Sequence, residues 1–337
     1  MKLTRLMSWG MLLVFLAAAV FPVSVRAEGE TPEYATIHDT SIIFLPIAMR
    51  PGTSNPPLPT PQLTNIIDHT TLPLYDQIPD QYLRGAEAIR FMFLDRSVGS
   101  NINDGVTCLA ASSWATSPAN CRNYYSDLVN LTNNRTYTIN DPFIPEPIRF
   151  PGGNNRANIS FDFSGGAYWY EDVQYFVNNY PNLIANRDIV SWMPNYLQVG
   201  SDSTIAAQFF NMSYTGPGYN VRHMLDLEGQ YPNKTFVYYT SSLARIVGTS
   251  QATSFNSQMR TWARDNNKIL IDVAAIISHT PAGAPCVNAQ GYPIICREYT
   301  TESEGGHLGA VSAGKLRVAK AIWILLAQLA GWDGTPR

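Results

Sequence analysis

Most of the chain after its first quarter is a regular alternation of short apolar runs with longer segments of helical periodicity. The runs are rich in β-branched and aromatic residues and have the length of buried strands. They cover residues 89–94, 158–163, 188–193, 234–239 and 268–273. Helical spacing of apolar residues follows at 100–111, 168–179, 204–212, 220–229, 254–265 and 311–329. This alternation predicts a three-layer α/β/α sandwich around a mostly parallel sheet.

The N-terminus has the pattern of a secretory signal. Lys2 and Arg5 precede an apolar core from Met11 to Phe21, and Val25-Arg26-Ala27 offers small residues at the cleavage positions. A membrane anchor is the alternative, but this apolar run is short for a bilayer span. We expect cleavage near residue 27, export to the periplasm, cell surface or medium, and no membrane span in the mature chain.

A proline-rich stretch separates this leader from the folded part. Residues 46–61 contain six prolines together with Gly, Ser and Thr, which is typical of a semi-rigid linker. We therefore predict an N-terminal segment at 28–84 and a single catalytic or binding domain at 85–337, with the boundary between about 62 and 85.

Composition narrows the classes of partner. Charged residues make up 15% of the chain and the net charge is −3, without a basic patch interleaved with aromatics. This balance argues against a nucleic-acid partner. No cluster of His, Cys and acidic residues has metal-ligand spacing, so we expect neither a metal site nor a cofactor. Oligomeric state is left open.

Four cysteines form two local pairs, Cys108/Cys121 and Cys286/Cys296. In an exported chain this arrangement predicts two disulfides that close short loops. A metal site is the alternative, but neither pair has C-x-x-C spacing.

Ser97 occupies the turn between the first strong strand and the helix that follows. At such a corner the side chain is exposed, and backbone N–H groups at the helix start can hold an oxyanion. The ordinary alternative is that Ser97 only caps the helix.

His307 lies in the glycine-rich stretch Glu304-Gly305-Gly306-His307, just before the last helix. Glycines mark exposed or tightly turned backbone, so this histidine does not have the sequence setting of a buried core residue. Glu304 is placed to accept the imidazole Nδ1–H, with Glu302 as a second candidate. The alternative is a solvated acidic loop with an incidental histidine.

Three further positions follow strand ends: Gly165, Gly166 and Asn195. In parallel α/β sheets, sites collect at the carboxyl ends of strands. The order strand–Ser, strand–Gly, strand–Asn and then acid-x-x-His resembles the SGNH (GDSL-type) hydrolase superfamily, whose members have a flavodoxin-like α/β/α fold and act mainly on esters.

The stretch Phe93 to Gly99 also resembles the F-x-x-x-S-x-G start of a group of exported bacterial SGNH-like proteins. His307-Leu308 and the stretch from Leu325 to Trp332 are similar to the end of that group. The resemblance covers residues 85–334. It implies Ser97 as nucleophile, His307 as general base and Glu304 as the orienting acid.

The resemblance also implies an oxyanion hole built from Gly165 or Gly166 and Asn195. The chain departs from the family where Asp95-Arg96 replaces the Gly-Asp before the serine and where Asn195 lacks the usual flanking pattern. Arg96 would bind an acidic group of the substrate or point outward.

We therefore expect an exported serine esterase that acts on a small-molecule or polysaccharide ester, carbohydrate O-acyl groups included. Tyr168, Trp169, Tyr170 and Trp192 are candidates for stacking on the substrate, with core or rim packing as the alternative. The second hypothesis for the whole chain is a catalytically inactive cell-surface protein of the same fold that binds glycan or protein.

Overall fold

The computed structural model describes residues 65–111, 116–121, 123–125, 134–136, 158–246, 249–300, 302–308 and 312–334. The expected signal sequence and the proline-rich linker lie outside these residues, and both stay predictions.

A six-stranded sheet forms the centre of the domain, and every neighbouring pair of its strands is parallel. Its spatial order is β1-β8-β7-β6-β2-β5. The bounds are β1 (Ile66–Ile67), β2 (Phe91–Asp95), β5 (Ile159–Phe163), β6 (Ile189–Trp192), β7 (Thr235–Tyr239) and β8 (Ile269–Ile271). A separate antiparallel pair consists of β3 (Asn123–Tyr125) and β4 (Asn134–Thr136).

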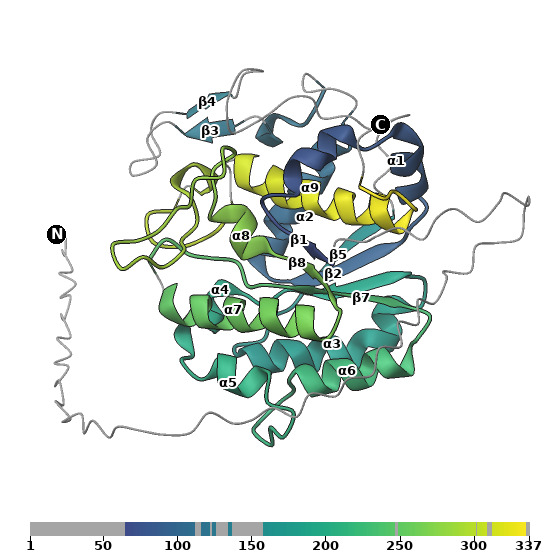
Figure 1. Ribbon diagram of the computed structural model, residues 1–337, viewed down its shortest axis with the longest axis vertical. Coiled ribbons are helices and arrows are strands. Elements are labelled where there is room, and N and C mark those ends of the chain that lie inside the picture. Colours follow the sequence, from purple (N-terminus) through teal and green to yellow (C-terminus); the bar gives the residue numbers. More distant parts are fainter. Residues whose placement is uncertain are drawn as a thin grey trace, which may run out of the picture. The chain divides into compact units, whose positions relative to one another are not determined.

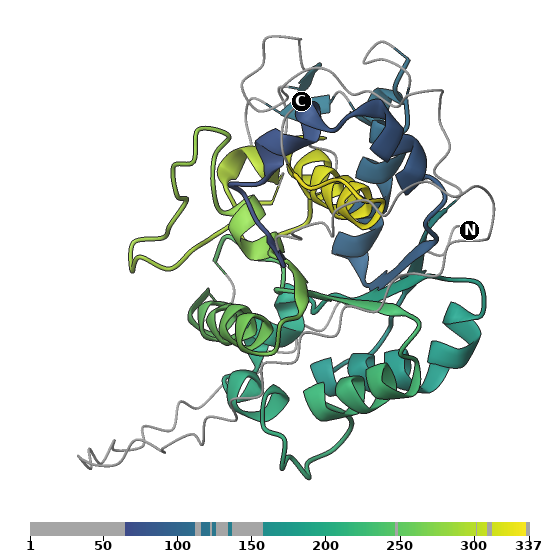
Figure 2. The same cartoon turned by 45° about the vertical axis from the view of Figure 1, so that its right-hand side comes forward.

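Helices cover both faces of this sheet (Figure 1). One face carries α1 (Asp80–Ala86), α2 (Ser97–Leu109), α8 (Val273–Ile277) and α9 (Ser312–Leu329). The opposite face carries α3 (Trp169–Ile184), α4 (Tyr196–Ser201), α5 (Ile205–Phe209), α6 (Val221–Gln230) and α7 (Thr249–Asp265). Figure 2 shows the same two helical layers from a second direction. The predicted three-layer α/β/α sandwich is confirmed.

Three short 3₁₀ helices complete the described elements: η1 (Leu72–Gln77), η2 (Ala119–Cys121) and η3 (Arg297–Tyr299). The two disulfides predicted from the cysteine pairs are present, Cys108–Cys121 and Cys286–Cys296. The first joins α2 to η2, and the second closes the loop that leads towards residue 307.

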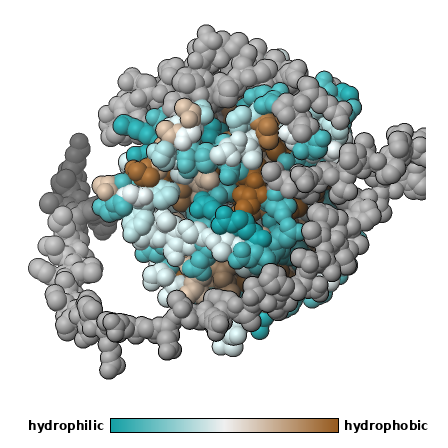
Figure 3. Space-filling model, in the orientation of Figure 1, coloured by the Kyte–Doolittle hydropathy of each residue, from teal (hydrophilic) through white to brown (hydrophobic). Residues whose placement is uncertain are grey.

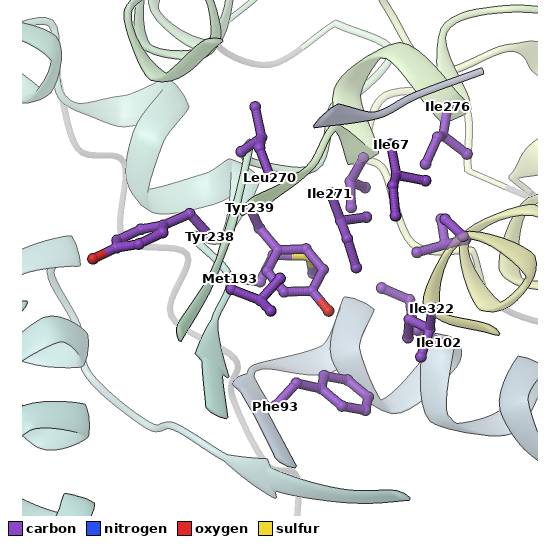
Figure 4. Close-up of a cluster of buried hydrophobic side chains, with 14 of the residues drawn as sticks. Ile67, Phe93, Ile102, Met193, Tyr238, Tyr239, Leu270, Ile271, Ile276 and Ile322 are labelled. Atoms are coloured by element: carbon purple, nitrogen blue, oxygen red, sulfur yellow. The ribbon is translucent and has the colours of Figure 1, made fainter. Parts of the chain in front are cut away.

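The core lies on both faces of the sheet, and the part that positions the site lies where the sheet meets α2 and α9. All five residues of β2 are buried, which is the pattern of a strand covered on both faces. In Figure 4, Phe93 and Tyr239 from the sheet lie among Ile102 of α2 and Ile322 of α9. Complete burial of a side chain of this size stabilises the fold by about 2 kcal/mol. This packing fixes the start of α2, and therefore Ser97, against the end of β2.

Residues 65–84, which the sequence places in the N-terminal segment, contribute to the main fold. β1 pairs with β8 in the main sheet, and η1 and α1 pack against α9. The fold therefore includes residues near the start of the expected boundary range of about 62 to 85, because a two-residue strand is too short to leave a recognisable period in the sequence.

Among the described residues, no helix has both the length and the apolar content that crossing a bilayer requires. On the face drawn in Figure 3, apolar residues form separate patches among polar ones.

Candidate active site

Ser97 is the first residue of α2, directly after the corner at the end of β2. The N-cap position belongs to Arg96, whose side chain makes no capping hydrogen bond. The alternative in which Ser97 serves as a helix cap therefore does not describe the structure. Its side chain is half-buried and turned to a residue 210 positions away.

The partner of this serine is His307. Ser97 Oγ lies 2.6 Å from His307 Nε2, which is a hydrogen-bond distance. The histidine side chain is 32% exposed, so the imidazole is partly accessible to solvent. The fold thus brings the loop before α9 to the carboxyl end of β2, as the sequence order predicts for a nucleophile and its base.

The carboxylate that contacts this histidine is Glu302, and the prediction that placed Glu304 there is wrong. Glu302 Oε1 is hydrogen-bonded to His307 Nδ1, and Glu302 Oε2 accepts the backbone N–H of His307 at 3.0 Å. One carboxylate therefore fixes both the ring and the backbone of the histidine. With Nδ1 held by an acceptor, Nε2 is the nitrogen that faces the serine hydroxyl.

The Glu304 side chain is exposed, and its backbone binds a different loop. Its carbonyl accepts the N–H groups of Arg245 and Ile246 at 3.1 and 3.0 Å, in the loop after β7. The chain turns between residues 303 and 305, and this turn returns Glu302 towards His307. The Thr300 hydroxyl donates to the His307 carbonyl at 2.5 Å and holds the other end of the loop.

Tyr196 is a site residue that the sequence did not indicate. Its ring packs edge-on against the His307 ring at 5.8 Å between centroids, and its hydroxyl lies 3.5 Å from Nδ1. Burial, and next the charge of Glu302, raise the pKa of this phenol, so it stays protonated. Its position directly after Asn195, at a strand end, was the available signal.

Asn195 lies at the carboxyl end of β6, where it caps α4. Its Oδ1 accepts the Leu197 N–H at 2.8 Å, and the residue is 1% exposed. The carboxyl edges of β6, β2 and β5 are neighbours in the sheet, so this amide belongs to the same edge as Ser97.

Gly165 and Gly166 follow β5 on the other side of Ser97. Gly165 is exposed, and a Cβ added there would meet no atom within 4 Å. Gly166 is different, because its N–H donates to Asp172 Oδ1 at 2.9 Å. Of the two glycines predicted to donate to an oxyanion, Gly166 is therefore already engaged.

Arg96 is not directed towards solvent. Its Nη1 donates to the Gly166 carbonyl at 2.7 Å, so the guanidinium binds the loop after β5. This internal contact differs from the expectation of an outward-pointing side chain, whereas a role of Arg96 in binding an acidic substrate group stays a prediction.

A buried carboxyl group, Asp95, lies directly behind the serine corner. It is 1% exposed, and neither of its oxygens makes a hydrogen bond of ordinary geometry within the described residues. Burial raises the pKa of Asp95 to about 7, with a smaller contribution from the charge of Asp172. The nearby N–H groups of Arg96 and Gly99 and the Arg96 charge act in the opposite direction.

The aromatic residues predicted near the mouth divide into two groups. Trp169 and Trp192 are each 1% exposed and belong to the core, which was the alternative interpretation. Tyr168 is 57% exposed and stacks on Tyr170, with 5.2 Å between ring centroids. Only this tyrosine pair remains available for a substrate.

Within the described part of the chain, no three His, Cys, Asp or Glu side chains are grouped in a way that could hold a metal ion. His223 and His279 contact other residues. His223 completes the cap of α6 through Asn220, and His279 stacks on His69 at 3.6 Å between centroids.

No family model and no curated protein matches this sequence. Among solved structures, one similar chain is a candidate acylhydrolase from Bacteroides fragilis NCTC 9343, with 13% identity and a TM-score of 0.35 over 70% of this chain and 88% of that one. Another is a candidate lipolytic protein of the G-D-S-L family from Desulfitobacterium hafniense DCB-2, with 8% identity and a TM-score of 0.33 over 68% and 98%. At such scores the overlap assigns no activity, and the function has to come from the site itself.

Proposed function

We propose that this protein is a serine hydrolase that cleaves esters with Ser97, His307 and Glu302. The observation that carries the proposal is the continuous chain of contacts from the Ser97 hydroxyl through His307 to the Glu302 carboxylate. A hydroxyl, an imidazole and a carboxylate in this order are the parts that activate an oxygen nucleophile.

In the acylation step, Ser97 Oγ attacks the ester carbonyl while its proton moves to His307 Nε2. Glu302 stabilises the imidazolium that forms, because its carboxylate already holds the Nδ1–H. When the tetrahedral intermediate collapses, the carbon–oxygen bond to the alcohol breaks and the imidazolium returns its proton to the leaving alkoxide. Water then attacks the acyl-serine by the same route, with His307 again as the base, and releases the acid.

The negative oxygen of the intermediate needs hydrogen-bond donors aimed at its position. The Gly165 N–H and the backbone N–H of Ser97 at the start of α2 are the backbone candidates, and the Asn195 side chain supplies an NH₂ group. Loss of one such donor costs about 3 kcal/mol of transition-state stabilisation.

The two disulfides support the location of this protein in an oxidising compartment, which agrees with the signal-like N-terminus. The substrate is then an ester outside the cytoplasm. The exposed Tyr168 ring, stacked on Tyr170, is a surface on which an aromatic or carbohydrate part of the substrate could stack.

The test is hydrolysis of p-nitrophenyl acetate by the wild type and by two serine variants. We expect Ser97→Ala to reduce turnover to the background rate. Ser100→Ala is the matched control, because Ser100 lies on the same helix one turn later and is exposed. Equal rates for the wild type and Ser97→Ala would refute the proposal.

Labelling by a fluorophosphonate probe separates catalysis from the alternative of a binding protein with the same fold. An activated serine reacts with the probe, so peptide mapping should find the label on Ser97 and not on Ser100. A binding protein without an activated serine would stay unlabelled.

A further inference from the structure

The backbone of Gly166 is held at both of its polar groups. Its N–H donates to Asp172 Oδ1 at 2.9 Å. Its carbonyl accepts two bonds, one from Arg96 Nη1 at 2.7 Å and one from Gln198 Nε2 at 2.8 Å. Three side chains thus fix the two peptide groups that meet at the Gly166 Cα.

These three side chains come from three different loops or helices. Arg96 immediately precedes Ser97 at the end of β2, and Gln198 lies on α4, three residues after Asn195. Asp172 lies in the first turn of α3, the helix that follows the β5 loop. Because β6, β2 and β5 are neighbours, these contacts of the Gly166 backbone link the segments that follow three adjacent strands.

Asp172 also holds the residue on the other side of Gly165. The Ser164 hydroxyl is hydrogen-bonded to Asp172 Oδ1, and both residues are buried, at 0% and 1% exposure. Gly165 therefore lies between two residues that are anchored to the same carboxylate. These anchors restrict the backbone on both sides of Gly165, where a Cβ would meet no atom within 4 Å.

The close approach of Asp172 depends on glycine at position 166. A Cβ added to Gly166 would lie 2.3 Å from Asp172 Oδ1, which is far inside contact distance. A side chain at this position would displace the carboxylate or the loop. The glycine is thus required by the contact with Asp172.

Arg96 also contributes a positive charge beside two buried carboxyl groups, Asp172 and Asp95. Burial raises the pKa of Asp172, whereas its hydrogen bonds with Ser164, Gln198 and Gly166 and the positive charge of Arg96 lower it. The same guanidinium charge acts on the buried Asp95. Arg96 is therefore a counter-charge for two buried carboxyl groups as well as a donor to the loop.

We propose that Asp172, Arg96 and Gln198 are positioning residues that clamp the Gly166 backbone on both sides of its Cα and thereby aim the Gly165 N–H at the oxyanion of the reaction. This inference rests on the proposed ester hydrolysis and assigns a role to three residues that do not contact the reacting atoms. Preorganised donors stabilise a transition state only when their direction is fixed beforehand, and a displacement of about 1 Å costs on the order of 10²-fold in rate.

The experiment compares kcat and KM of Asp172→Ala and Asp172→Asn with those of the wild type on p-nitrophenyl acetate. Asn keeps an oxygen that can accept from Gly166 and Ser164, whereas Ala keeps none. We expect Asp172→Ala to lose on the order of 10²-fold in kcat with KM within about threefold, and Asp172→Asn to recover most of that loss. Inhibition by phenylboronic acid, which forms a tetrahedral adduct on serine, should weaken in parallel with kcat.

Asp272→Asn is the matched control for disturbing a buried carboxylate. Asp272 is 2% exposed and follows β8, three strands away from β2 in the sheet. We expect this variant to lower the melting temperature but to leave kcat within about threefold. A folded Asp172→Ala protein with wild-type kcat would overturn the clamp and leave the serine mechanism intact.

If Asp172→Ala does not fold, the carbonyl side of the clamp offers the same test. Gln198→Leu and Arg96→Met each remove a donor to the Gly166 carbonyl, and we expect each to lower kcat about tenfold at unchanged KM. Full kcat in both would overturn the proposal. A wild type without Ser97-dependent turnover and without probe labelling would refute the proposed function, and the clamp with it.

Discussion

Two buried aspartates stand at equivalent places in the sheet, and they differ in how they are satisfied. Asp95 ends β2 and Asp272 follows β8, and each is followed by a helix. Asp272 caps α8 through the Ala275 N–H at 3.0 Å, accepts the Thr240 hydroxyl at 3.0 Å and pairs with Arg260. Asp95 has an equally buried position, yet its two oxygens make no ordinary hydrogen bond among the described residues.

The contrast distinguishes a structural strand end from the strand end beside the proposed nucleophile. A buried carboxylate with a full set of donors stabilises its surroundings, whereas one without them is costly and has a raised pKa. Such unsatisfied groups concentrate at active sites. In this molecule the unsatisfied carboxyl group adjoins the candidate nucleophile, and the satisfied one lies three strands away.

The largest expected effect concerns the histidine at each of these two edges. His307→Asn should lower kcat by about 10⁴-fold or more, because the base for Ser97 is lost. His279→Asn changes a histidine near the β8 edge, where the ring stacks on His69, and should leave kcat within about threefold. Steady-state kinetics on p-nitrophenyl acetate measure both. Equal losses in the two variants would remove the distinction between the edges.

The next effect concerns the carboxylate that serves His307. Glu302→Gln should lower kcat about 10³-fold, because the imidazolium loses its charged partner. Glu304→Gln should have no comparable effect, since that side chain is exposed and its residue contacts the β7 loop through its carbonyl. A greater loss in Glu304→Gln than in Glu302→Gln would contradict the geometry of the loop.

The third effect is a dependence of stability on pH. The pKa of Asp95 is raised from 3.8 to about 7, so the folded protein holds this proton at pH values where the unfolded chain releases it. The free energy of unfolding should therefore decrease as the pH rises from about 4 to about 7. Each pKa unit corresponds to about 1.4 kcal/mol, which limits the decrease to about 4 kcal/mol.

Asp95→Asn isolates this contribution, because asparagine resembles the protonated acid and does not titrate. The difference between wild type and variant in urea unfolding should grow from pH 4 to pH 7, with the variant the more stable at pH 8. A pH-independent difference would mean that Asp95 titrates normally in the folded state.

The smallest expected effect lies at the β8 edge. Asp272→Asn removes the charge that Arg260 and the Thr240 hydroxyl contact, and should lower the free energy of unfolding by about 2 kcal/mol at neutral pH. Urea unfolding at pH 7 and at pH 5 checks this value. If Asp272→Asn instead raised the free energy of unfolding at pH 7, the Asp272 carboxylate would be destabilising, as is expected for Asp95.

The local pattern of apolar residues was sufficient to predict the α/β/α architecture and some of the candidate site residues. Buried strands of β-branched and aromatic residues, alternating with amphipathic helices, have few ways to cover their apolar faces other than a parallel sandwich. A serine at the end of one such strand is carried to the same edge as the residues after its neighbours. Both disulfides could also be predicted, since each closes a short loop.

The choice between Glu302 and Glu304 could not be made from spacing. It depends on the turn at residues 303–305 and on the contact of the Glu304 backbone with the loop after β7, which is about 60 residues earlier in the chain. Tyr196 and Asp172 were missed for the same reason, because each acts through partners that are distant in sequence.

The sequence alone determined which residues end the strands and hence which edge of the sheet carries polar chemistry, because strand and helix periodicity are local properties. Only the tertiary structure decided which carboxylate meets His307, which carboxyl group is buried with a raised pKa beside Ser97 and which side chains hold the Gly166 backbone. Each of these contacts depends on the direction of a side chain over a few ångströms, and the packing between distant segments sets that direction.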